Sequence, residues 1–148
     1  MDFLKVTVFV DGRDIDVSVR RGAMATAEFG TIVDGAEVPK SRVAVIADIR
    51  DGIPVAWTQV SKYEGDKIVI EGEGWLGSAV EKASIVGEVV TGGVSILDAN
   101  QESHIKCLEE AEFGILACCT SSSGSCYVRC CGGCCSDPAG CPGASCCP

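Results

Sequence analysis

No cysteine precedes Cys107 in this chain of 148 residues, although the complete sequence has 11. A disulfide framework or a cysteine metal site is therefore excluded from the N-terminal two thirds. Histidine is scarcer still, with His104 as its single instance, so no Ser/His/Asp or Cys/His pattern of a nucleophilic enzyme is present. We expect a protein without enzymatic activity whose distinctive chemistry lies in the C-terminal third.

Positive charge is also in short supply: 12 Lys and Arg residues stand against 21 Asp and Glu residues, a formal net charge of −9. An acidic protein repels phosphate backbones and anionic lipids, and no basic stripe offsets this repulsion. No apolar stretch approaches the ~20 residues that a membrane-spanning helix needs. We therefore expect neither a nucleic-acid partner nor insertion into a membrane.

The opening residues, "MDFLKVTVFVDG", are not typical of a Sec signal peptide. They place an acid at position 2 and a lysine inside the apolar run, and they offer no small-residue cleavage site. Synthesis in the cytoplasm is expected from this, whereas a high cysteine count favours an oxidising compartment. Assembly at a surface or outside the cell by a non-Sec route would reconcile the two, and the sequence leaves the localisation open.

Alternating apolar and polar residues predict strands through most of the first 97 residues, and Asp11-Gly12 and Asp51-Gly52 are typical turns of β-hairpins. The runs are residues 4–10, 15–19, 42–49, 53–60 and 67–71, with two short strands between 84 and 97. Pro54 has no N–H for a ladder, so it should lie at a strand start or on an edge strand. Five to eight short strands predict a mainly β fold, an antiparallel β-sandwich or barrel.

One short helix is predicted after these strands. Asp98 followed by Gln101 forms a capping box, good helix formers come next, and Gly114 is a plausible stop. The chain is therefore expected to have three parts. They are a β-sandwich domain at residues 1–97, a helical connector at 98–113 and an irregular, cysteine-rich tail at 114–148.

The tail consists almost entirely of small residues, and it cannot bury enough apolar area to offset its chain entropy unless cross-links or metal order it. Adjacent cysteines are poorly placed to bond each other, so each adjacent pair should reach two different partners. Because the count is odd, at least one thiol stays free or pairs with another chain, and Cys107 is the expected one. The candidate cross-linking residues are Cys107, Cys118, Cys119, Cys126, Cys130, Cys131, Cys134, Cys135, Cys141, Cys146 and Cys147.

Our first functional hypothesis is a structural, self-assembling subunit whose arm is cross-linked by disulfides within and between chains. Its partners would be other copies of itself, aligned along the edges of the first hairpin or of the strand that contains Pro54. Such a plan is similar to that of spore-appendage and related fibre subunits, which join β-sandwiches through cysteine-bearing arms. This hypothesis requires no cofactor.

Two alternatives remain open. The spacing of Cys130, Cys131, Cys134 and Cys135 includes the C-x2-C unit of a thiolate knuckle and could bind Zn or Cu. Residues 118–148 also resemble the core of a ribosomally made peptide precursor, and that resemblance implies modification of the cysteine and serine side chains.

Several residues before the cysteine-rich tail are candidates for a functional site. The segment Gly72–Gly77 matches the dinucleotide pattern G-x-G-x-x-G, but acidic neighbours and the hairpin context favour a turn or bulge instead. Trp57 and Trp75 are expected in the core, and His104 is expected to be an exposed helix residue. We expect three acidic residues, Asp14, Asp16 and Asp48, to lie on the solvent faces of strands. The alternative is that they form a Ca²⁺ site at a sheet edge.

Overall fold

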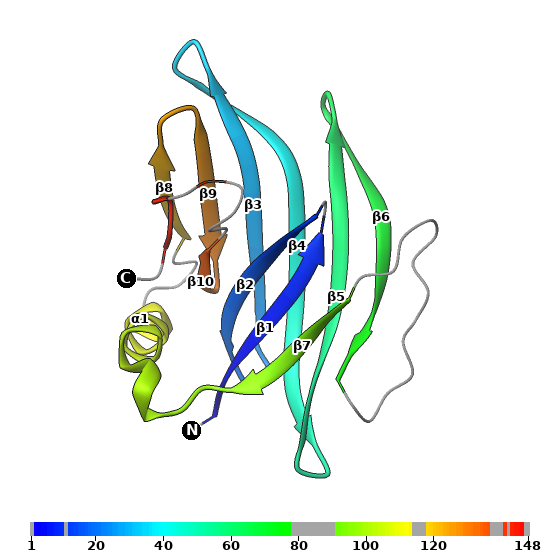
Figure 1. Cartoon of the computed structure of the whole chain (residues 1–148), viewed down its shortest axis with the longest axis vertical. Coiled ribbons are helices and arrows are strands. Elements are labelled where there is room, and N and C mark those ends of the chain that lie inside the picture. Colours follow the sequence, from blue (N-terminus) through cyan, green and yellow to red (C-terminus); the bar gives the residue numbers. More distant parts are fainter. Residues whose placement is uncertain are drawn as a thin grey trace.

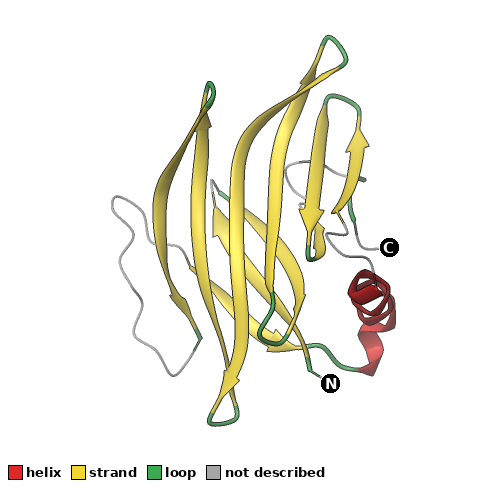
Figure 2. Ribbon diagram, turned by 180° about the vertical axis from the view of Figure 1, so that it is seen from behind, coloured by secondary structure: helices red, strands yellow, loops and turns green. Residues whose placement is uncertain are grey.

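The computed structural model describes residues 2–10, 12–77, 91–113, 118–136, 141 and 143–146. These residues form two antiparallel β-sheets that lie face to face, with a helix at one side (Figures 1 and 2). The predicted mainly β, antiparallel sandwich with one short helix is confirmed. Predictions that concern Asp11, residues 84–90, Gly114 and Cys147 lie outside the described residues.

The smaller sheet has four strands in the order β10-β2-β1-β7. Its strands are β1 (Phe3–Val10), β2 (Arg13–Arg20), β7 (Thr91–Ile96) and β10 (Gly133–Ser136). The predicted first hairpin is present as β1 and β2, which pair in register from Phe3↔Arg20 to Val10↔Arg13.

The larger sheet has six strands in the order β6-β5-β4-β3-β9-β8. Its strands are β3 (Met24–Val33), β4 (Ala36–Arg50), β5 (Ile53–Glu64), β6 (Lys67–Leu76), β8 (Cys118–Ser123) and β9 (Cys126–Cys131). The predicted turn between β4 and β5 is confirmed, since Asp51 and Gly52 both have positive φ. The β3–β4 hairpin is not among the predicted strands, although Asp34-Gly35 forms the same kind of turn.

The core lies between the two sheets and is built from the alternation that predicted the strands. Val6 and Val17 of the small sheet are opposite each other in register, and Val43 and Val45 come from the large sheet. All four side chains are at most 1% exposed. Full burial of a valine contributes about 1.5–3 kcal/mol, so this cluster drives the association of the sheets.

The predicted helix start is also confirmed. The Asp98 side chain accepts a hydrogen bond from the Asn100 N–H (3.0 Å), and the Gln101 side chain accepts one from the Asp98 N–H (3.2 Å). This capping box opens the short 3₁₀ turn η1 (Ala99–Gln101), which leads into α1 (Glu102–Phe113). In the part of the chain that the structure describes, no helix combines the length and the hydropathy needed to cross a membrane.

Two expectations about strand positions and the tail require correction. Pro54 lies at the start of its strand, as predicted, but β5 is an interior strand between β4 and β6 and is not an edge along which copies could align. The first hairpin is also interior, since β7 and β10 flank it. Residues 118–136 are not irregular: they supply strands to both sheets, because the edges of β3 and β2 provide backbone partners that the sequence alone does not reveal.

Candidate functional site: the disulfide-bonded C-terminal strands

The C-terminal strands connect the two sheets of the sandwich. The β8–β9 hairpin adds to the large sheet beside β3, and β10 adds to the small sheet beside β2 (Figure 1). Gly132 and Gly133 make this crossing possible. Gly132 has φ +77°, and a Cβ there would lie 2.5 Å from the Met24 carbonyl oxygen, while a Cβ on Gly133 would collide with the Ser18 carbonyl oxygen.

The two adjacent cysteines of β9 point to opposite faces of the sheet, as successive residues of a strand must. Cys130 is 1% exposed between the sheets and bonds Cys135 of β10. Cys131 is only half-buried and bonds Cys118, its partner across the β8–β9 ladder. The prediction that adjacent cysteines reach different partners is confirmed here, and one disulfide of this pair links the two sheets.

The cysteines of β10 diverge in the same way, and one of them holds the helix. Cys134 is buried in a small cluster with Phe3, Leu97 and Leu108, and it bonds Cys107 of α1. The expectation that Cys107 is the unpaired thiol is therefore wrong. Packing of α1 on this cluster brings the Cys107 side chain to a cysteine that is distant in sequence.

The structure contains five disulfides among the described residues. They are Cys107–Cys134, Cys118–Cys131, Cys119–Cys146, Cys126–Cys141 and Cys130–Cys135. These bonds use ten of the 11 cysteines in the sequence. While they are present, Cys147 has no cysteine of its own chain to bond.

The half-cystines also serve as core residues, which explains how a segment of small residues becomes ordered. Cys141, Ala144 and Cys146 are at most 7% exposed and belong to the main hydrophobic cluster. The Cys146 N–H donates to the Cys135 carbonyl (3.0 Å), so this segment is fixed by backbone as well as by sulfur. Cysteine behaves as a small hydrophobic residue, so these half-cystines supply core area to a segment expected to have too little of it.

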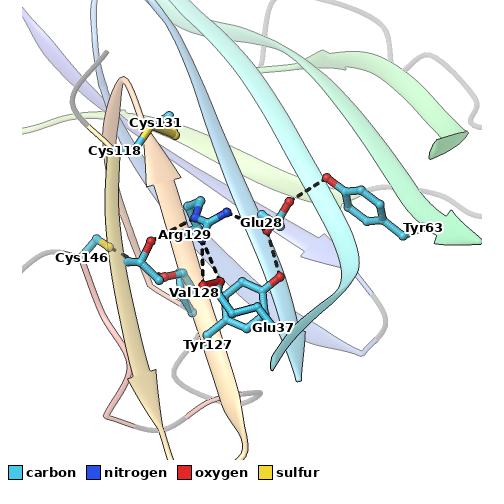
Figure 3. A network of polar contacts seen from close by, with 10 residues as sticks. Glu28, Glu37, Tyr63, Cys118, Tyr127, Val128, Arg129, Cys131 and Cys146 are labelled. Carbon is cyan, nitrogen blue, oxygen red and sulfur yellow. Dashed lines mark hydrogen bonds and ion pairs between the residues drawn. A yellow bond between two sulfur atoms is a disulfide. The ribbon is translucent and has the colours of Figure 1, made fainter. Parts of the chain in front are cut away.

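A polar network fastens β9 to the large sheet on its outer face (Figure 3). Glu28 of β3 accepts hydrogen bonds from the phenols of Tyr127 (2.9 Å) and Tyr63 (2.8 Å), one on each carboxylate oxygen. Arg129 donates to Glu37 of β4 (2.8 Å to Oε2) and lies 3.8 Å from Glu28 Oε2. One carboxylate therefore joins the C-terminal hairpin to β5, although β3 and β4 lie between β9 and β5 in the sheet.

Burial and the negative neighbour both affect the tyrosines of this network. Removal from solvent raises the pKa of Tyr127, and its hydrogen bond to the Glu28 carboxylate raises that pKa further. The pKa of Tyr63 is raised by the same two causes in the same order. Both phenols therefore remain protonated hydrogen-bond donors well into the alkaline range.

The two tryptophans are not core residues, contrary to expectation. Trp57 and Trp75 are opposite each other in the β5–β6 ladder and are half-buried. Their rings meet edge to face with centroids 5.6 Å apart, and the Arg50 guanidinium lies 4.4 Å from the Trp75 ring centre. Neighbouring Thr58 is buried, so alternation turns the two indoles away from the core.

The remaining sequence candidates have structural roles. Gly72–Gly77 lies mostly within β6, and the expected bulge occurs where Val60 pairs with Gly72.

His104 is half-buried rather than exposed, since its Nδ1 lies 3.1 Å from the Ser18 Oγ. Asp14 is exposed. The other two aspartates are half-buried: Asp16 accepts a hydrogen bond from Thr7 Oγ1 (2.7 Å), and Asp48 accepts one from Arg21 Nε (2.8 Å).

The four cysteines of the metal alternative do not form a thiolate cluster here. Cys130 and Cys135 are bonded to each other, whereas Cys131 and Cys134 bond Cys118 and Cys107. Among the described residues, no three His, Cys, Asp or Glu side chains are arranged to hold a metal ion. Metal binding by these cysteines would require prior reduction of three disulfides.

No family model matches this chain, and no curated protein or solved structure matches it. The function of this chain is therefore inferred from its disulfides, its strand edges and its charges.

Proposed function

We propose that this chain is a non-enzymatic structural subunit that is linked to other copies of itself by a disulfide. The observation that carries the proposal is the pairing of ten cysteines in five intrachain bonds, which leaves Cys147 without a cysteine partner in its own chain. A thiol without an internal partner in an otherwise fully oxidised protein is suited to bond a second chain.

A structural subunit should resist unfolding, and the positions of the disulfides support this property. Cys130–Cys135 joins the two sheets, Cys107–Cys134 holds the helix to the small sheet, and Cys118–Cys131 closes the C-terminal hairpin. A disulfide that closes a loop of about 15 residues stabilises a fold by roughly 3 kcal/mol through its effect on the unfolded chain. Several such bonds in one region would make it hard to unfold without reductant.

Charge is consistent with the same role. The formal net charge of −9 keeps free subunits soluble, while the region from residue 118 onward has only Arg129 and Asp137 as charged side chains. Two copies can therefore bring their C-terminal regions together with little repulsion.

The test uses the full chain produced under oxidising conditions, with Cys147→Ser as the matched control. We expect the wild type to give covalent multimers on a non-reducing gel that collapse with reductant. The Cys147→Ser chain should run as a monomer whose intact mass shows five disulfides. A wild type that stays monomeric with one titratable thiol would contradict the proposal.

The same mass measurement separates the alternatives. Metal adducts that are lost in acid would instead favour a thiolate metal-binding protein. Mass losses that reductant does not reverse would favour a modified-peptide precursor.

A further inference from the structure

Strand β6 is an edge of the large sheet with an unusual sequence. Among the described residues it pairs with β5 alone, so the backbone groups along its other side have no strand partner. Natural edge strands normally carry charges, prolines or bulges where they are exposed, because an unpaired edge is a template for another chain.

The first half of β6 has three consecutive exposed apolar residues instead. Ile68, Val69 and Ile70 are 50%, 38% and 57% exposed. Successive strand residues point to opposite faces, so both faces of this segment are apolar. The cause is visible in Figure 1: the end of the β5–β6 hairpin extends beyond β1 and β2, and the small sheet does not cover it.

The segment Lys67–Glu71 is also self-complementary. Its sequence, Lys-Ile-Val-Ile-Glu, has opposite charges at its ends and Val69 at its centre. If two copies pair antiparallel about a two-fold axis through Val69, each Lys67 is opposite a Glu71, and each Ile68 is opposite an Ile70. Opposite charges and β-branched residues are favourable cross-strand pairs, whereas like charges directly opposite are unfavourable.

We propose that β6 pairs antiparallel with β6 of a second copy, in this register, and continues the large sheet across the two molecules. The bulge at Glu71 limits the intermolecular ladder to this short segment. Glu71 already contacts Lys62 of its own chain (Nζ to Oε1, 3.1 Å) and would be shared with Lys67 of the second copy. A slip of one residue would turn every side chain to the other face and lose both ion pairs.

The β6 contact would add a second kind of link to the proposed assembly, and its role in that assembly rests on the proposed function. Cys146 is bonded to Cys119 of β8, and β8 is the opposite edge of the same sheet from β6. A two-fold contact at one edge and a covalent contact near the other cannot both close on the same pair of molecules. Together they would link more than two molecules, into an open filament or a closed ring.

The experiment separates the two contacts by using the full-length Cys147→Ser chain, which cannot form the covalent link. Analytical ultracentrifugation over a range of concentrations should show a reversible dimer. Val69→Lys places two like charges at the two-fold axis and should abolish this dimer. Val33→Lys is the control, since Val33 is 52% exposed on β3 and lies away from the β6 edge.

Charge exchange tests the register. Lys67→Glu and Glu71→Lys, each alone, put like charges opposite each other twice and should weaken the dimer roughly tenfold. An equal mixture of the two variants restores both ion pairs in the mixed dimer and should recover the affinity. Melting curves of each variant verify that it is folded.

Three results would overturn the inference: a Cys147→Ser chain that is monomeric at all concentrations, a dimer that survives Val69→Lys, or a mixture no tighter than its components. None of these results bears on covalent multimers of the wild type, which are scored separately on non-reducing gels. Failure of the β6 contact and failure of the proposed function are therefore distinguishable.

Discussion

The ring of Tyr127 lies directly against the backbone of Gly30, its partner across the β3–β9 ladder. A Cβ built on Gly30 would be 2.5 Å from the Tyr127 Cε1 atom and would also collide with the Val38 carbonyl oxygen. Because Gly30 has no side chain, β3 leaves the space that the Tyr127 ring of the C-terminal hairpin fills. This allows Tyr127, which is 1% exposed, to reach Glu28 with its hydroxyl group.

Gly30→Ala should destabilise the fold by about 1–3 kcal/mol, because the added methyl group forces the ring and the neighbouring strand apart. The measurement is denaturant unfolding of the oxidised chain. Gly93→Ala is the control, since a Cβ at Gly93 meets nothing within 4 Å and should change stability by less than about 0.5 kcal/mol. Equal stability of the two variants would mean that β9 is not held against β3 as described.

The free energy of unfolding should fall as the pH rises above about 10, the usual pKa of tyrosine in an unfolded chain. The raised pKa values of Tyr127 and Tyr63 keep both phenols protonated in the folded protein after the unfolded chain has lost those protons. The folded state then binds more protons than the unfolded state, so stability is complete below pH 10 and is lost progressively above it.

Denaturant unfolding at several pH values checks this expectation in the Cys147→Ser chain, whose lack of that thiol limits disulfide exchange at high pH. Tyr127→Phe should show a smaller loss of stability across the same range. If both chains have the same pH dependence, or if the native tyrosines ionise at their usual pKa in an absorbance titration, the proposed environment of Glu28 is incorrect.

The five disulfides should be reduced in an order set by their burial. Cys118 is exposed and Cys131 half-buried, whereas Cys130 and Cys135 are both 1% exposed. An attacking thiolate must reach a sulfur atom, so Cys118–Cys131 should open first and Cys130–Cys135 last. Limited reduction, alkylation and peptide mapping give the order, and a parallel reaction in denaturant should erase it. Early labelling of Cys130 under native conditions would show that the link between the sheets is accessible.

A chain that ends at residue 113 should fail to fold cooperatively. The three-part division expected from the sequence would instead let such a chain fold, because strand alternation is clearest before Leu97. In the structure, loss of the C-terminal strands removes one of the two strand partners of β3 and of β2. It also exposes Phe29 and Val17, which are at most 2% exposed in the full chain. Circular dichroism and a thermal melt decide between the two expectations: a cooperative β transition in the short chain would support the predicted boundary at 113/114.

The sequence by itself determined the local structure of this protein. Alternation of apolar residues defined β1, β2, β4 and β5, the Asp51-Gly52 dipeptide defined a hairpin turn, and Asp98 with Gln101 defined the helix start. Each of these signals acts over a few residues, through side-chain direction, allowed backbone angles or a cap. The strand after Gly22 could have been found in the same way from its Asp34-Gly35 turn.

Only the tertiary structure decided which strands are edges, which face the tryptophans occupy and which cysteines meet. Alternation assigns residues to two faces but does not say which face is covered, so Trp57 and Trp75 were assigned to the core although they lie on the outer face. Cysteine spacing does not fix connectivity, because a disulfide forms between residues that the fold brings together, as with Cys107 and Cys134. The tail had too little apolar area to order itself, and it is ordered because β3 and β2 offer it backbone partners and its own sulfur atoms complete the core.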